Sequence, residues 1–85
     1  MYYVYVLLSR KDNHMYIGFS ADMEKRLRAH NAGKVRSTKS RRPFVLVYFE
    51  NYSFESEALN REKYLKSGIG REFIKDKIRS VPAAM

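Results

Sequence analysis

Several residue types are rare or missing in this sequence, and each absence argues against a class of site. The 85 residues include no cysteine and no tryptophan, with only two prolines, four glycines and two histidines. Without cysteine the chain can form neither a disulfide nor a thiolate metal site, and two distant histidines argue against a zinc site. The apolar runs have the length of strands, too short for a bilayer, and no basic segment precedes an apolar one at the N-terminus. We therefore expect a cytoplasmic protein without a membrane partner.

Acidic residues are also scarce. Seventeen lysines and arginines stand against nine aspartates and glutamates, which gives a formal net charge of +8. A basic excess of this size predicts a polyanionic partner, because each neutralised phosphate releases condensed counterions. Nucleic acid suits the sequence better than an anionic membrane, since no long stretch predicts a helix with a broad apolar face. The length corresponds to a single domain over residues 1–85 with a modest core.

Three apolar segments predict a small β-sheet. Residues 2–8 combine β-branched and aromatic side chains without a breaker, and they are apolar on both faces, as in a central strand. A polar turn at 11–14 separates them from Met15–Gly18, so these two runs most simply form an antiparallel hairpin. Residues 44–49 predict the third strand. We expect an α/β chain of the α+β type, with a three-stranded antiparallel sheet flanked by about three helices.

The first predicted helix begins at about Asp22, with Ser20 or Asp22 as its cap, and stops at 31–33, where a glycine favours a left-handed turn. On a helical projection Arg26 and His30 lie one turn apart, beside the apolar stripe instead of opposite it. This placement favours a functional role for Arg26. The alternatives are a packing role for the aliphatic stem of Arg26 and a structural, hydrogen-bonded role for His30.

The second predicted helix opens at Ser53, with glutamates in its first turn that complement the helix dipole. Glu62 falls in the middle of its apolar stripe, where a carboxylate must be protonated, paired with a cation or bound to a metal. Pairing with a neighbour such as Arg26 is the structural alternative. Glycines at 68 and 70 predict a break before a last helix over 71–80, which covers the sheet, and a tail that frays.

Gly18 ends the second strand just before the first helix, and its missing side chain permits a ligand to approach the backbone. An anion is the ligand expected at such a junction of strand and helix. Tyr3 and Tyr5 share one face of their strand, and Tyr16 shares a face with Gly18. If the register brings these faces together, two phenol hydroxyls converge near the glycine.

Residues 34–42 form a basic loop without an acid, in which five cations accompany three hydroxyls. This composition predicts a phosphate-binding surface, although a basic run can also be a solvated loop. The predicted substrate-binding residues are Gly18, Lys34, Arg36, Thr38, Lys39, Arg41 and Arg42.

Together, Tyr3–Tyr5, Tyr16–Gly18, Arg26, His30 and Glu62 resemble the GIY-YIG nuclease superfamily, over roughly residues 2–66. Further residues are similar to the small stand-alone bacterial members of that superfamily, which in turn are similar to the nuclease domain of the eukaryotic structure-specific endonuclease that trims branched DNA. These further residues are His30–Gly33, Thr38, Arg41–Pro43 and Leu46–Tyr48.

The resemblance implies a metal-dependent endonuclease that hydrolyses phosphodiester bonds in DNA, with branched or damaged DNA as a substrate. By position it implies two motif tyrosines, a motif glycine, an arginine and a metal-binding acid, with His30 as a further catalytic residue. The implied catalytic residues are Tyr5, Tyr16, Arg26, His30 and Glu62. Glu62 would hold one Mg²⁺ or Mn²⁺ ion.

Two departures from the superfamily pattern accompany this resemblance. Phe19 stands where the repair-incision relatives have a lysine, and residues 67–70 offer no asparagine after the acidic helix. The alternative functions are a nucleic-acid-binding module of the same fold with little or no turnover, and an RNA binder whose aromatics stack on bases. In each case the small size predicts that a protein partner or a homodimer supplies specificity.

Overall fold

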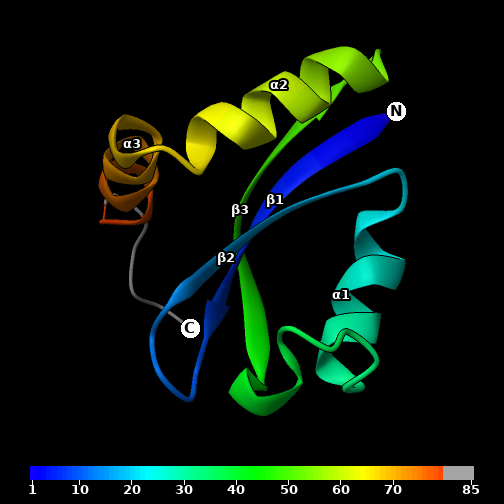
Figure 1. Cartoon of the computed structure of the whole chain (residues 1–85), viewed down its shortest axis with the longest axis vertical. Coiled ribbons are helices and arrows are strands. Elements are labelled where there is room, and N and C mark those ends of the chain that lie inside the picture. Colours follow the sequence, from blue (N-terminus) through cyan, green and yellow to red (C-terminus); the bar gives the residue numbers. More distant parts are fainter. Residues whose placement is uncertain (80–85) are drawn as a thin grey trace.

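The computed structural model describes residues 1–79, which fold into one sheet with helices on both faces (Figure 1). The elements in chain order are β1 (Tyr2–Ser9), β2 (Met15–Ser20), α1 (Met23–Asn31), the 3-10 helix η1 (Lys39–Arg41), β3 (Phe44–Tyr52), α2 (Glu55–Leu65) and α3 (Gly68–Arg79). No helix in this described part of the chain is both long enough and apolar enough to span a bilayer.

The sheet has the order β2-β1-β3, and both pairings are antiparallel. The prediction that the first strand is central is therefore confirmed. Val4, Val6 and Leu7 are fully buried because each face of this strand is covered. One irregularity occurs between Val6 and Leu7, where β3 contributes Val47 as an extra residue to the ladder.

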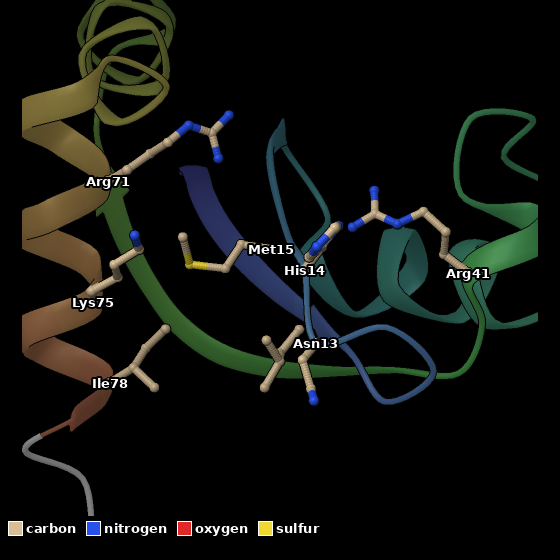
Figure 2. A pocket seen from close by; sticks show the side chains of 8 residues that line it. Asn13, His14, Met15, Arg41, Arg71, Lys75 and Ile78 are labelled. Atoms are coloured by element: carbon tan, nitrogen blue, oxygen red, sulfur yellow. The ribbon is translucent and has the colours of Figure 1, made fainter.

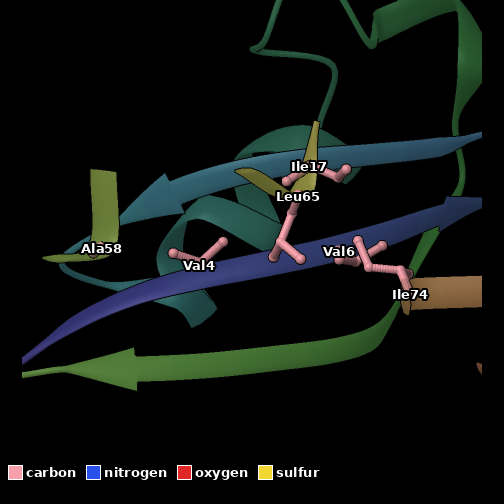
Figure 3. Close-up of a cluster of buried hydrophobic side chains, with 6 residues drawn as sticks. All are labelled: Val4, Val6, Ile17, Ala58, Leu65 and Ile74. Carbon is pink, nitrogen blue, oxygen red and sulfur yellow. The ribbon is translucent and has the colours of Figure 1, made fainter. Parts of the chain in front are cut away.

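Each face of the sheet has its own core. On one face, Val4, Val6 and Ile17 pack against residues of α2 and α3, including Leu65 and Ile74 (Figure 3). On the other face, Tyr5, Leu7 and Phe44 pack against α1. Alternate residues of β1 thus enter opposite cores, as the twofold period of a strand requires. The central strand consequently carries both the packing that holds α2 and a residue of the candidate site.

The first helix follows the sequence-based prediction closely. Asp22 is the N-cap, and its carboxylate accepts the backbone N–H of Lys25 at 3.0 Å. Ser20 caps nothing and instead bonds to the backbone of Asp22. Gly33 has a φ of 78°, so the expected left-handed turn after the helix is confirmed.

The second helix begins later than predicted, and Ser53 does not cap it. The strand β3 continues to Tyr52 because its last residues pair with the first residues of β1. Ser53 therefore lies in the bend, and Phe54 takes the N-cap position without a side-chain hydrogen bond. The prediction of helix-dipole glutamates in the first turn is confirmed by Glu55 and Glu57.

The predicted break before the last helix is present, but it falls at Lys66 and Ser67 and not at the two glycines, which both lie in the first turn of α3. A Cβ at Gly70 would lie 2.1 Å from the carbonyl oxygen of Tyr64, so only glycine permits α3 to pack this closely on the end of α2. Ser67 caps the helix by accepting the N–H of Gly70 at 3.2 Å. Ile74 is fully buried, as predicted. The predicted fraying of the tail falls outside the described residues.

Candidate active site

The candidate site is built on the pairing of β1 with β2. Tyr5 lies opposite Gly18 and Leu7 lies opposite Tyr16, so Tyr5 and Tyr16 are diagonal neighbours on the face that α1 covers. Their ring centroids are 6.4 Å apart. His30 of α1 packs against both rings, with its centroid 4.7 Å from that of Tyr16. The register required for the two phenols to converge is therefore present.

The space beside Gly18 is filled by the protein itself. A Cβ at this position would lie 2.4 Å from the Tyr5 hydroxyl oxygen. The expectation that this space admits a ligand is corrected accordingly, because the phenol of Tyr5 occupies it. The glycine allows the Tyr5 ring to cross β2, with its hydroxyl directed toward His30 of α1.

His30 is fully buried and hydrogen-bonded through both ring nitrogens. Nε2 lies 3.2 Å from the Tyr5 hydroxyl, and Nδ1 lies 2.8 Å from Oγ1 of Thr38. The Thr38 hydroxyl donates to the carbonyl of Val35 at 3.4 Å. Three hydrogens need an acceptor here: those of the Tyr5 hydroxyl, the His30 ring and the Thr38 hydroxyl. All of them find one only if Tyr5 donates to Nε2 and Nδ1–H donates to Thr38. This chain assigns His30 the Nδ1–H tautomer.

Burial and the neighbouring charge of Arg26 shift the pKa values of both His30 and Tyr5. Burial, together with the positive charge of Arg26, lowers the pKa of His30 to about 4, so this imidazole is neutral near pH 7. Burial raises the pKa of Tyr5 to about 12, against hydrogen bonding from Arg26, which lowers it. Arg26 itself is exposed, and its guanidinium reaches the buried phenol from the solvent side through that hydrogen bond. The predicted cation beside the tyrosines is thus in place.

Glu62 approaches the same phenol from α2, which packs on the opposite face of the sheet. It lies between Ala58 and Leu65, both fully buried, so the predicted position on the inner stripe is confirmed. Its side chain is 21% exposed, and Lys66 Nζ lies 3.6 Å from Oε2. The charge of Glu62 contributes to the raised pKa of Tyr5. The site therefore straddles the edge strand β2, with Glu62 on one side and Arg26 on the other.

The donor set around Glu62 fits a weakly held hard cation. No three His, Asp or Glu side chains gather into a metal-binding group within residues 1–79. A single half-buried carboxylate suits Mg²⁺, which keeps most of its water ligands and takes the rest from substrate phosphates. Lys66, half exposed on the next turn, is free to swing away from such an ion.

The basic loop divides into exposed cations and residues that hold the loop in place. Thr38 is fully buried under the loop, so its predicted contact with substrate is corrected: its hydroxyl binds His30. Arg41 pairs with Asp12 of the β1–β2 turn at 3.1 Å, and its guanidinium lies over the Phe44 ring. The cations that remain exposed are Lys34, Arg36, Lys39 and Arg42.

A second polar cluster, not foreseen from the sequence, fixes α2. Glu50 of β3 accepts two hydrogen bonds from Arg61, at 2.8 and 3.1 Å, and one from each of Tyr48 and Tyr52. Burial alone would raise the pKa of Glu50, but these donors outweigh it and lower that pKa. Arg61 precedes Glu62 in α2, so the cluster positions the carboxylate of the site. The signal in the sequence was an acid flanked on the same strand face by two tyrosines.

Asn31 is a second residue whose role the sequence did not reveal. Its amide accepts the backbone N–H of Phe44 at 2.7 Å and donates to the carbonyl of the same residue at 3.0 Å. This two-point contact ties the end of α1 to the start of β3, across the basic loop. His30, one residue earlier, is consequently held in register with Tyr5.

Known proteins are similar to this chain in sequence and in fold. Residues 1–72 match the family described as the GIY-YIG catalytic domain. The UPF0213 protein SH2523 of Staphylococcus haemolyticus is 48% identical over 67 residues, which cover 78% of this chain and 80% of that protein. The UPF0213 protein CPE1444 of Clostridium perfringens is 45% identical over the same length, with 71% of it covered. A solution NMR structure of the UPF0213 protein BH0048 from Bacillus halodurans aligns over both complete chains, with 27% identity and a TM-score of 0.56.

Proposed function

Because this chain belongs to the GIY-YIG catalytic domain family, which makes it a nuclease-type domain, we propose that it is a metal-dependent endonuclease that hydrolyses phosphodiester bonds in DNA. The observation that carries the proposal is the Tyr5 hydroxyl, which is bonded to His30 and lies within the electrostatic reach of both Arg26 and Glu62. Arg26 and Glu62 carry opposite charges on the two sides of the edge strand β2. The cation can bind the phosphate, and the carboxylate can hold the metal ion beside it.

Arg26 binds the scissile phosphate in this proposal. Attack of water on a phosphodiester builds negative charge on the nonbridging oxygens, and a fixed cation aimed at them lowers the barrier. The planar guanidinium can donate to two of these oxygens at once. Arg26 is exposed, so a phosphate reaches it without any rearrangement of the core.

The two tyrosines divide the remaining work. Tyr5 is almost fully buried, and its hydroxyl donates to a neutral histidine. With a pKa of about 12 it stays protonated, so it orients its neighbours and does not act as the base. Tyr16 is only half-buried, on the solvent side of the same cluster, and it is therefore the tyrosine that orients or deprotonates the attacking water. His30 holds Tyr5 in place.

Glu62 is the residue that would hold the metal, either Mg²⁺ or Mn²⁺. When bound there, the ion would stabilise the negative charge that develops on the leaving oxygen. The hydrogen bonds between Glu50 and Arg61 keep the preceding turn of α2 on the sheet, and so keep the carboxylate at the edge of β2.

Branched or damaged DNA is the proposed substrate class, and a protein partner or a second copy of the chain is proposed to select it. The second candidate function is a nucleic-acid-binding module without turnover. The net charge of +8 and the exposed cations of the basic loop favour it, because binding needs neither Glu62 nor Tyr16. A cytoplasmic location is part of the same proposal.

The test is cleavage of labelled single strands, duplexes, flaps and junctions with Mg²⁺, with Mn²⁺ and with chelator. Glu62→Gln removes the charge at constant volume, and Glu55→Gln, exposed on the same helix, is the matched control. We expect cleavage by the wild type and by Glu55→Gln, none by Glu62→Gln, and unchanged DNA affinity for all three. Equal cutting by all three proteins would overturn the role of Glu62, and no cutting by the wild type would favour the binding module.

A further inference from the structure

A groove of about 610 Å³ lies between α3 and the β1–β2 hairpin (Figure 2). None of the five predicted catalytic residues lines it. Its volume falls in the range of small-molecule and cofactor sites, about 300–1,000 Å³. The groove is therefore a feature separate from the phenol cluster described above.

The walls of the groove are basic. Arg71 and Lys75 extend from α3 on one side, while Arg41 reaches from η1 on the other side toward His14 (Figure 2). Among the described residues, no acid lines the groove. Within residues 1–79, Arg71 donates from Nε to the carbonyl of Lys66 at 3.2 Å, and no partner there takes its terminal amino groups, which can face a ligand. Lys75 pairs with Glu72 at 3.7 Å, both exposed, which is a weak contact that a phosphate can replace.

The floor of the groove is aliphatic. It is formed by Leu8, Met15 and Ile78, each half-buried. A duplex presents phosphates to a protein and keeps the faces of its bases stacked inside, so it could use the walls but not this floor. An unpaired nucleotide offers both a phosphate and an apolar base face, as the grooves that bind single strands require.

The position of the groove relates it to the candidate active site. Met15 of the floor directly precedes Tyr16, and the two side chains point to opposite faces of β2. β2 is an edge strand, so no other strand separates the groove from solvent or from the phenol cluster. From Met15 to Gly18 the strand advances about 10 Å, at about 3.3 Å per residue. One nucleic-acid strand can therefore pass along this edge and reach both places.

We propose that this groove binds an unpaired segment of the nucleic-acid substrate, with phosphates on Arg71 and Lys75 and a base on the aliphatic floor. The inference rests on the proposed function, because it names the part of the substrate that lies next to the scissile phosphate. It favours substrates with a single-stranded arm or gap over intact duplex.

The test is fluorescence anisotropy with a labelled twelve-nucleotide oligothymidylate, with the matching duplex, and with a strand of abasic spacers, all in chelator so that nothing is cut. Arg71→Gln/Lys75→Gln removes both phosphate contacts, and Lys25→Gln/Arg28→Gln removes two exposed charges from α1 as the matched control. For single strands, the loss of two phosphate contacts makes the negative slope of log affinity against log salt shallower by about 1.4. At about 0.1 M salt this corresponds to an affinity about 25-fold weaker. Circular dichroism melts verify that both variants fold.

We expect the loss for the single strand with the groove variant only, and weaker wild-type binding of the abasic strand. Equal losses in both variants would show unspecific charge and overturn the proposal. An equal loss for the duplex, or an abasic strand bound as tightly as the natural one, would overturn the single-strand assignment. This binding test is independent of the cleavage test described under the proposed function. If the wild type cuts none of the substrates but the groove variant still loses single-strand affinity, the endonuclease proposal fails and the groove proposal stands.

Discussion

Replacing Thr38 by valine tests the hydrogen-bond chain that sets the tautomer of His30. The change keeps the shape of the side chain and removes the hydroxyl, which accepts Nδ1–H at 2.8 Å and makes a longer contact of 3.4 Å with the carbonyl of Val35. Thr38 is fully buried, so water cannot take the place of the hydroxyl. A buried donor left without an acceptor costs about 1–3 kcal/mol, or roughly 5- to 150-fold in the folding equilibrium.

The imidazole can escape that cost only by moving its proton to Nε2. That nitrogen would then donate to the Tyr5 hydroxyl, which lies 3.2 Å away, and the phenol would lose the acceptor for its own hydrogen. Because Tyr5 is 1% exposed, its hydroxyl would have to turn away from His30 within a closed core. Either outcome disturbs the group next to Arg26, so we expect slower cleavage as well as lower stability.

Two measurements separate these outcomes. Urea unfolding gives the free-energy loss, and the ring ¹⁵N shifts of His30 report which nitrogen carries the proton. The control is Thr38→Ser, which keeps the hydroxyl and should keep the Nδ1–H tautomer. A wild-type ring protonated at Nε2, or a valine variant with unchanged stability and unchanged ring shifts, would refute the proposed chain.

Three further results are expected. As the pH falls from about 6.5 to about 4, His30 becomes protonated in the unfolded chain but stays neutral in the folded one, so the free energy of unfolding should fall by about 3 kcal/mol. His30→Gln should abolish this pH dependence, measured by urea unfolding at a series of pH values. At still lower pH, from the ordinary glutamate pKa of about 4.3 downward, the lowered pKa of Glu50 adds a further loss of stability; a Glu50→Gln variant that retains the same acid slope would contradict this. Gly18→Ala places a Cβ 2.4 Å from the Tyr5 hydroxyl oxygen and should cost about 1–3 kcal/mol by overpacking, whereas Gly68→Ala, which meets nothing within 4 Å, should be neutral or stabilising in thermal melts.

Much of the fold could be predicted because its signals are local. Residues 2–8 are apolar on both faces, and such a run must be covered on both faces wherever it lies, so the central position of β1 followed directly. The cap at Asp22 and the left-handed turn at Gly33 depend on single residues and their immediate neighbours. The boundaries at Ser53 and Gly68 could not be predicted, because one depends on how far β3 pairs with β1 and the other on how closely α3 packs on α2.

The sequence by itself determined the order of the elements, the excess of positive charge and the residue types of the site, since propensity, charge and motif spacing can all be read along one chain. Only the tertiary structure decided what each of these residues contacts. It filled the space at Gly18 with Tyr5, turned Thr38 inward to His30, and opened a basic groove beside β2. Such contacts join residues far apart in the chain, and they exist only once strand register and helix packing have brought the two partners within a few ångströms.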